Sequence, residues 1–167
     1  MPAYKAKEVE SLITLFAKND SLEKMSYPKI TNIKESKNAG YEMIGATGLS
    51  CIACHDFNGQ QSGGAGALEL IHVTERIKKN WFHLYMRNPS RFHPTVIMPS
   101  YWPGGEAIRK EILNGQTDQQ IEALWNYLSD GARAKNPKGL SRQSLTLRVA
   151  DETVMCRGRG TAGYRGI

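Results

Sequence analysis

The five residues CIACH, at positions 51–55, constrain the fold of this chain most, because each chemistry that they can support requires different surroundings. A redox-active Cys-x-x-Cys pair needs a preceding β-strand and a helix N-terminus, which lowers the pKa of its first thiol. A structural zinc site needs four ligands, normally in two closely spaced pairs. Covalent attachment of a haem needs two thiols, an adjoining imidazole, a second axial ligand and an apolar pocket.

The surrounding sequence disfavours the first two of these chemistries. The segment AGYEMIGATG, from Ala39 to about Gly48, has the periodicity of a helix and not that of a strand. A second closely spaced pair of zinc ligands is missing from the sequence, since the other cysteine and histidine residues are scattered. These residues are Cys156, His72, His83 and His93. Haem attachment is therefore the favoured interpretation.

In this interpretation, Cys51 and Cys54 form thioethers with the two vinyl groups of one haem c. His55 follows the second cysteine directly and binds the iron from the proximal side. The sixth iron ligand must come from elsewhere in the chain. The candidates are Met43, Met86, Met98, His72, His83 and His93.

Met98 is the favoured sixth ligand. It precedes Pro99 in the loop TVIMPSYWP, where a missing amide donor and a fixed φ can hold a thioether pointing inward. Met86 and His83 belong to a short predicted helix, where a packing role is expected instead. His93 lies in the same loop as Met98, so bis-histidine ligation remains the alternative.

Apolar periodicity predicts a mainly helical chain. Helices are expected over residues 6–18, 39–48, 70–79, 81–88, 106–114 and 118–130. The last of these has the strongest pattern, with apolar residues at i, i+3, i+4 and i+7, namely Ile121, Leu124, Trp125 and Leu128. Irregular segments are expected in the glycine-rich residues 58–67 and in the proline-rich residues 89–105. Alternating apolar residues over 145–149 indicate a strand that turns into a short β-hairpin.

Polar residues and glycines mark the expected helix ends. Asn80 is expected to cap the helix over 81–88, which Pro89 stops. Gly115 is suited to the left-handed position that closes the helix over 106–114. Thr117 and Gln120 are expected to form a capping box for the last helix.

The order of these elements resembles class I c-type cytochromes over about residues 38–130. The blocks CIACHDFNG, ERIKKNWFHLYMRNP, MPSYWPGG and QIEALWNYLSDG are similar to haem-binding domains fused to large dehydrogenase-like proteins in planctomycete-type bacteria. The resemblance implies one covalent haem on Cys51 and Cys54, with His55 and Met98 as the iron ligands. It also implies that the GYEMIG helix packs against the IEALWNYL helix. Four aromatic residues are expected to serve packing or to line the pocket, namely Trp81, Trp102, Trp125 and Tyr127.

The expected fold is therefore mainly α, a cytochrome c-like helical fold around one haem, and it divides the chain into four parts. These are an N-terminal helical extension (1–37), the haem domain (38–130), a basic linker (131–144) and a short β segment (145–167). The β segment departs from ordinary class I cytochromes and reads as the start of a truncated further domain. Cys156 within it is expected to be buried and inert.

The expected function is electron transfer between ferric and ferrous haem iron, without enzymatic activity of the chain itself. Its partner is expected to be a redox protein or a fused dehydrogenase domain, which passes electrons to a respiratory acceptor. The alternative is a haem-based gas sensor or peroxidase-like domain whose sixth position is open or weakly held. Nucleic acid is not expected as a partner, because most of the net charge of +6 comes from the segment after residue 130.

Membrane insertion is not expected either, because no apolar run reaches the roughly 18 residues that a spanning helix needs. The beginning of the sequence lacks the features of a secretory signal and reads as an excised piece with an added start codon. Attachment of haem to thiols normally occurs outside the cytoplasm. The resemblance therefore implies the periplasm or an equivalent compartment.

Overall fold

The computed structural model describes residues 6–19 and 25–140, and within these ranges the chain is mainly helical. The α-helices are α1 (Ala6–Asn19), α2 (Ile33–Ile44), α3 (Val73–Arg76), α4 (Lys79–Arg87), α5 (Pro89–Phe92) and α6 (Thr117–Leu128). Single 3₁₀ turns occupy Cys51–Ala53, Leu70–His72, Pro103–Gly105, Leu113–Gly115 and Gly131–Arg133. The described ranges hold two isolated β-bridges but no β-strand. The prediction of a mainly α fold is confirmed at this level, whereas the predicted β-hairpin and Cys156 lie outside the described residues.

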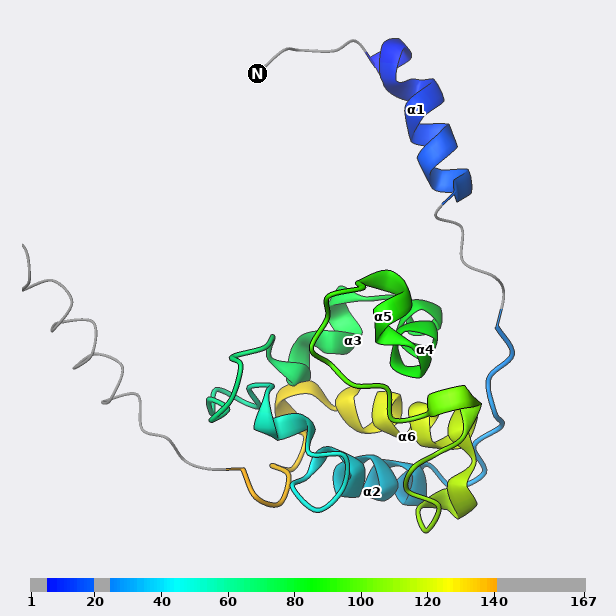
Figure 1. Cartoon of the computed structure of the whole chain (residues 1–167). Helices are drawn as coiled ribbons and strands as arrows, with labels where there is room; N and C mark the ends of the chain where they lie inside the picture. Colours follow the sequence, from blue (N-terminus) through cyan, green and yellow to red (C-terminus); the bar gives the residue numbers. More distant parts are fainter. Residues whose placement is uncertain (1–5, 20–24, 141–167) are drawn as a thin grey trace, which may run out of the picture.

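Helix α6 lies between α2 on one side and α4 with α5 on the other (Figure 1). The pairing of α2 with α6, which the resemblance implies, is the most extensive contact between elements. Gly40 allows this close approach, because an added Cβ atom would lie 2.3 Å from the carbonyl oxygen of Ala123 and 2.7 Å from Cβ of Tyr127. Apolar side chains between the helices are almost completely buried, among them Met43, Ile44, Phe57, Ile121 and Leu124.

Helix α2 begins and ends earlier than the predicted helix over 39–48. The Oδ1 atom of Asn32 accepts a hydrogen bond of 3.1 Å from the backbone N–H of Glu35 and so caps the helix at its start. The first turns escaped prediction because their side chains are mostly exposed and polar, and so carry no apolar period. The helix ends where Gly45 adopts an extended conformation. Because α2 begins at Ile33, its first turn lies inside the predicted N-terminal extension (1–37).

The predicted helix over 106–114 is wrong. The side-chain amide of Gln120 donates hydrogen bonds of 2.7 Å to the carbonyl oxygens of Arg109 and Ile112, which a continuous helix would use internally. Leu113 and Asn114 have φ values of 48° and 53°, outside the helical region. Gly115 has a positive φ as expected, but it closes only a 3₁₀ turn.

The predicted capping box of α6 is also wrong. Thr117 donates its Oγ1 hydrogen bond of 2.6 Å to the carbonyl oxygen of Gly105, so it joins two segments instead of capping the helix. Gln120 is buried and its Oε1 atom accepts a hydrogen bond of 2.9 Å from Nε1 of Trp102. Asn80 lies within the first turn of α4, which begins at Lys79, and is not its cap.

Two further segments differ from prediction in part. The expected helix over 70–79 consists of the 3₁₀ turn Leu70–His72 and the short α3, and it ends where Ile77 becomes extended. The expected irregular segment 89–105 contains α5 and a 3₁₀ turn, but the residues between them are irregular as predicted.

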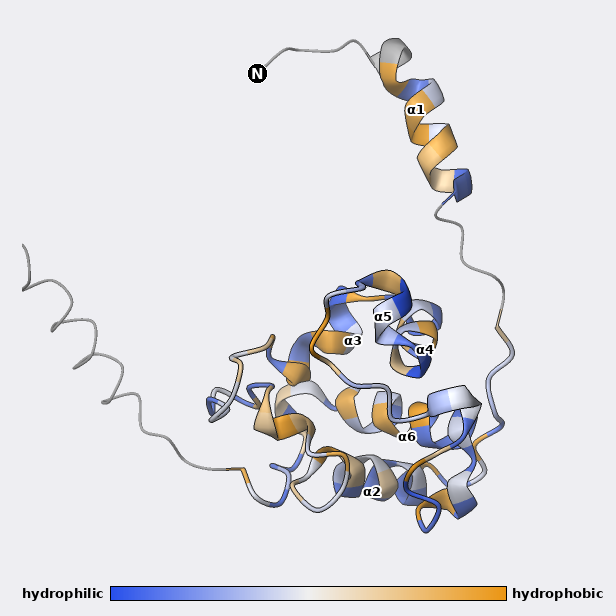
Figure 2. Cartoon of the chain, in the orientation of Figure 1, coloured by the Kyte–Doolittle hydropathy of each residue, from blue (hydrophilic) through white to orange (hydrophobic). Residues whose placement is uncertain are grey.

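Apolar residues recur along helix α1 (Figure 2), as predicted from its periodicity. Leu12, Ile13, Leu15 and Phe16 are between 50% and 62% exposed. In the described part of the chain, no helix is both long enough and apolar enough to span a lipid bilayer.

Candidate functional site

An apolar cavity of about 490 Å³ lies beside the CIACH segment. One part of its wall consists of Cys51, Cys54 and His55 together with residues 65–68 of the glycine-rich loop. The other parts of the wall come from α4, from residues 96–101 and from the end of α6. The side chains from these elements are Phe82, Tyr85, Met86, Val96, Ile97, Met98, Pro99, Tyr101, Leu124 and Leu128. The cavity therefore draws its wall from most of the described body.

A tight turn presents both cysteines and the histidine to the cavity. Ser50 has a φ of 55°, and the residues after it form the 3₁₀ turn Cys51–Ala53. The backbone N–H of His55 donates a hydrogen bond of 3.0 Å to the carbonyl oxygen of Cys51. The two thiols and the imidazole of the motif consequently line a single cavity. The two cysteines are not joined by a disulfide.

The glycine-rich loop holds His55 in one tautomer. The Nδ1 atom of His55 lies 2.7 Å from the carbonyl oxygen of Leu68. Because a carbonyl oxygen can only accept, Nδ1 is the donor in this contact, which leaves Nε2 as the nitrogen that can bind a metal. This is the state in which histidine binds a metal, and a carbonyl partner on the other nitrogen is its usual support.

The same loop is tied back to the motif along its length. The backbone N–H of Ala67 donates a hydrogen bond of 2.7 Å to the carbonyl oxygen of Cys54, and Oγ of Ser62 donates one of 2.9 Å to the same oxygen. Gly64 passes so close that an added Cβ atom would lie 2.2 Å from the carbonyl oxygen of Ala53. The sequence predicts a loop here, but it gives no sign that this loop supports His55.

Met98 lines the cavity from an irregular segment far along the chain. This segment is joined to α4 by a hydrogen bond of 2.8 Å from Oγ of Ser100 to the carbonyl oxygen of Arg87. Met98 is half-buried, whereas its neighbour Ile97 is 83% exposed. The fold thus brings Met98 to the same cavity as the CIACH motif.

The other candidates for the sixth iron ligand occupy different places. Met86 is buried and also lines the cavity, so a second thioether shares its wall. Met43 is fully buried in the core and does not line the cavity. His93 is exposed and absent from the wall, and His72 lies 3.1 Å from Glu75. His83 is buried on the side of α4 that faces Glu122.

Desolvation dominates the electrostatics of the cavity. The pKa of the Cys51 thiol is raised to about 12, mainly by desolvation; a backbone hydrogen bond opposes the shift and the neighbouring Cys54 adds to it. Desolvation also raises the pKa of Tyr101 to about 12, with both cysteines adding to the effect. A redox-active Cys-x-x-Cys pair requires a lowered thiol pKa, so the cavity does not suit thiol–disulfide exchange.

A zinc site finds no support in the described ranges. Among residues 6–19 and 25–140, no group of three or more His, Cys, Asp or Glu side chains is arranged to hold a metal ion.

Of the two roles expected for Trp81, Trp102, Trp125 and Tyr127, packing or lining the pocket, the structure supports packing. Trp102 is 1% exposed and donates to Gln120, and the hydroxyl of Tyr127 donates to the carbonyl oxygen of Lys135. Neither of them, nor Trp81 or Trp125, lines the cavity. The wall instead uses Phe82, Tyr85 and Tyr101. Sequence reasoning missed these three, although Tyr101 stands in the same loop as Met98.

A buried polar cluster joins α4 to α6 outside the cavity. Glu122 accepts a hydrogen bond of 2.6 Å from Nζ of Lys79 and lies 3.0 Å from Nε2 of His83. Burial lowers the pKa of His83 below its usual 6.5, although Glu122 acts in the opposite direction. The ring of Tyr27 covers this cluster, with its centroid 5.0 Å from that of His83.

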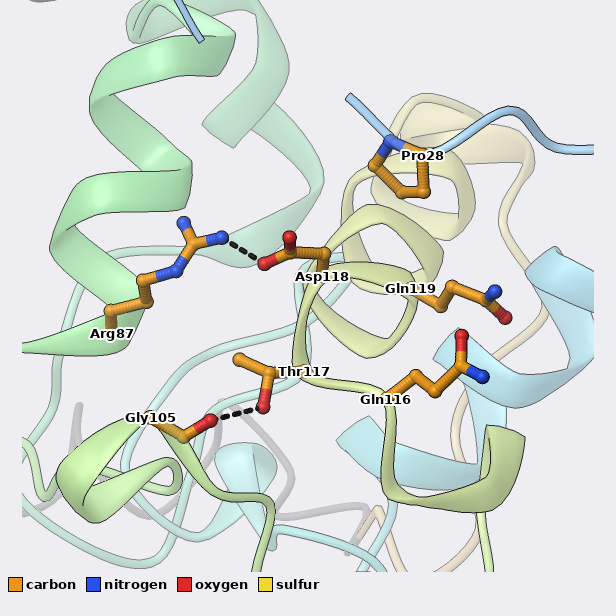
Figure 3. Close-up of a pocket in the computed structure, with 7 residues that line it drawn as sticks. All are labelled: Pro28, Arg87, Gly105, Gln116, Thr117, Asp118 and Gln119. Carbon is orange, nitrogen blue, oxygen red and sulfur yellow. Dashed lines mark hydrogen bonds and ion pairs between the residues drawn. The ribbon is translucent and has the colours of Figure 1, made fainter. Parts of the chain in front are cut away.

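A second hollow, of about 500 Å³, lies at the start of α6 and is open to solvent (Figure 3). Its charged groups are paired with each other, since Arg87 forms an ion pair with Asp118. None of the residues predicted for the site lines it. The hollow therefore does not compete with the apolar cavity as a functional site.

Comparison with protein-family models, with curated proteins and with solved structures gives no match to this chain.

Proposed function

We propose that this chain is a one-electron carrier that binds a single haem c covalently in the apolar cavity. The observation that carries the proposal is the shared cavity wall of Cys51, Cys54, His55 and Met98. These residues are the two thioether anchors and the two axial ligands that a Met/His c-type haem requires.

The donor set and the wall fit this group. Two thiols separated by two residues stand beside an imidazole whose Nδ1 donates to the carbonyl oxygen of Leu68 at 2.7 Å, so that Nε2 is the nitrogen available to a metal. The rest of the wall is almost entirely apolar. Such a wall suits the haem macrocycle, and it would disfavour ferric iron, which carries one more positive charge than ferrous iron. Met98 provides a thioether, which as an axial ligand also favours ferrous over ferric iron.

Each residue would have a separate task. Cys51 and Cys54 would anchor the group, and the carbonyl oxygen of Leu68 would keep His55 in its binding tautomer. Met98 would fill the sixth position and so exclude external ligands. A bound haem would supply reversible one-electron chemistry at its iron. No proton needs to move and no substrate needs to enter the cavity.

The proposal extends to the surroundings of the protein. A redox protein or a fused dehydrogenase domain would exchange single electrons with this domain. Because haem is normally joined to thiols outside the cytoplasm, the periplasm or an equivalent compartment is the proposed location.

Replacement of Met98 tests the axial ligand. Met98→Ala should abolish the weak ferric absorption band near the red end of the spectrum that reports sulfur ligation, and it should lower the reduction potential. Met86→Ala is the matched control, because it removes the other thioether of the same wall and should leave the band in place.

The reverse pattern would identify Met86 as the ligand and contradict the assignment. A high-spin spectrum of the unaltered protein, with rapid uptake of carbon monoxide or nitric oxide, would favour a gas sensor or peroxidase-like domain and contradict electron transfer.

A further inference from the structure

Three aromatic rings form a cluster on α4 and α5 that the cavity alone does not explain. The rings of Trp81 and Tyr85 are stacked, with centroids 4.6 Å apart and planes 14° apart. Phe92 packs against both, at 5.6 Å from Trp81 and 6.0 Å from Tyr85. All three residues are half-buried, so the cluster is part of the surface. We call these residues and their basic neighbours Lys78 and Arg91 the α4–α5 face.

The α4–α5 face reaches the cavity from outside. Tyr85 lines the cavity wall and at the same time stacks on Trp81. Electron transfer slows steeply as the distance between two centres grows. A partner bound on Trp81 would be close enough for transfer, because only the stacked rings of Trp81 and Tyr85 would separate it from the cavity. An aromatic cluster that served only to fill the core would not need this exposed side.

The same part of the chain carries basic residues and no acidic residue. Residues 76–105 contain no aspartate or glutamate, and their basic residues are Arg76, Lys78, Lys79, Arg87 and Arg91. Lys79 and Arg87 are neutralised by Glu122 and Asp118. The other three are exposed and form no ion pair with any described residue.

Two of these unpaired bases border the aromatic cluster. The guanidinium of Arg91 lies over the ring of Phe92, 5.8 Å from its centroid. Lys78 is the extended residue directly before α4, so it stands at the N-terminal end of the helix that carries Trp81 and Tyr85. The face therefore combines an apolar aromatic centre with a basic edge.

On two other surfaces the bases are paired with acids. On the opposite side of α6 from α4, Lys37 of α2 pairs with Asp130 at 2.6 Å. In the segment before α6, Arg109 and Lys110 lie near Glu111 and Glu106. Residues 131–140 also carry the bases Arg133, Lys135 and Lys138 and no acid, but none of them lines the cavity, whereas the α4–α5 face reaches it through Tyr85.

We propose that the α4–α5 face is the docking surface for an acidic electron-transfer protein, whose carboxylates meet Lys78 and Arg91 and whose apolar centre meets Trp81. The inference rests on the proposed function. One electron passes between the two proteins through the contact of Trp81 with Tyr85, one centre being oxidised and the other reduced, with no bond made or broken. Aromatic and arginine side chains are enriched at interfaces, and opposite charges accelerate encounter in a salt-dependent way.

A paramagnetic anion locates the face directly. Hexacyanochromate(III), a redox-inert trianion, is titrated into the haem-loaded protein, and broadening of the backbone amide signals is mapped by NMR. Broadening should centre on residues 78–92 and should be lost in K78E/R91E. The control is K34E/K138E, which changes the net charge equally at two exposed lysines and should keep the map. Broadening centred elsewhere, for example around Leu68 and Ile97, would overturn the proposal.

Kinetics with an anionic oxidant provides the second readout. Oxidation of the ferrous protein by hexacyanoferrate(III) at low ionic strength should slow by about tenfold in K78E/R91E. It should slow clearly less in K34E/K138E, and high salt should remove the difference. Equal rates in the two variants would overturn the proposal. Saturable binding of a labelled oligothymidylate that K78E/R91E abolishes would assign the face to single-stranded nucleic acid and also overturn it.

The haem content of the same sample separates this inference from the proposed function. If covalent haem is present and the anion maps elsewhere, the docking face is wrong and the proposed function stands. If covalent haem is missing, the proposed function fails, and the electron-transfer partner fails with it.

Discussion

The two walls of the cavity are built in different ways. The wall with Cys51, Cys54 and His55 is held by backbone hydrogen bonds, including the bond of 2.7 Å from Ala67 to Cys54. The wall with Met98 lies between α5 and the 3₁₀ turn that begins at Pro103. A side-chain hydrogen bond from Ser100 joins it to α4. The proposed anchors and proximal ligand therefore lie on a segment that backbone hydrogen bonds tie to a neighbouring loop, whereas the proposed sixth ligand lies on a segment that a side-chain hydrogen bond joins to α4.

One glycine that is close in sequence to each wall can test this difference in tolerance. Gly64→Ala places a Cβ atom 2.2 Å from the carbonyl oxygen of Ala53, so backbone must move. We expect a loss of about 3 kcal/mol in the free energy of unfolding. Gly104 has a φ of 63° and open space around it, so Gly104→Ala should cost only the left-handed strain, about 1 kcal/mol. Urea denaturation of both variants measures these values, and equal losses would show that the two walls are equally rigid.

The helix behind the Met98 wall should respond to acid through His83. The pKa of buried His83 is lowered in the folded protein, so below pH 6.5 the unfolded chain takes up a proton that the folded chain does not. The stabilisation is complete above pH 6.5 and is lost as the pH falls through the folded-state pKa. The slope approaches about 1.4 kcal/mol per pH unit for one proton.

The measurement is the free energy of unfolding between pH 7.5 and 5.5, compared with that of His83→Gln. The groups that face His83 are Glu122, Lys79, Arg87 and the ring of Tyr27. The comparison therefore uses a variant that changes His83 alone and leaves Glu122 in place. Gln at this position can still donate to Glu122 but does not titrate in this range. A slope that is unchanged in His83→Gln would contradict the assignment to His83.

Sequence reasoning succeeded where local pattern decides the structure. Helix α6 follows its apolar period, and the irregular segments follow their glycines and prolines. It failed where a distant side chain intervenes, as when Gln120 takes the carbonyl oxygens of Arg109 and Ile112 and prevents a helix there. A helical period in sequence carries no information about such competition.

The cavity shows the same division. The CIACH motif and the Met-Pro pair could be selected as site residues from sequence, because their chemistry and spacing are specific. The roles of individual aromatic residues could not, since Trp102 and Tyr101 are adjacent and yet only Tyr101 lines the cavity. The partner that decides this, the side chain of Gln120, binds Trp102 from another helix.

The most direct test of the central claim is the pyridine haemochrome spectrum of purified protein after extraction with acid acetone. If Cys51 and Cys54 anchor one haem, the spectrum should show one haem per chain with both vinyl groups saturated. In the variant with both cysteines replaced by alanine, the haem should be extracted. Protein without haem, or haem that stays attached when both cysteines are replaced, would contradict the account.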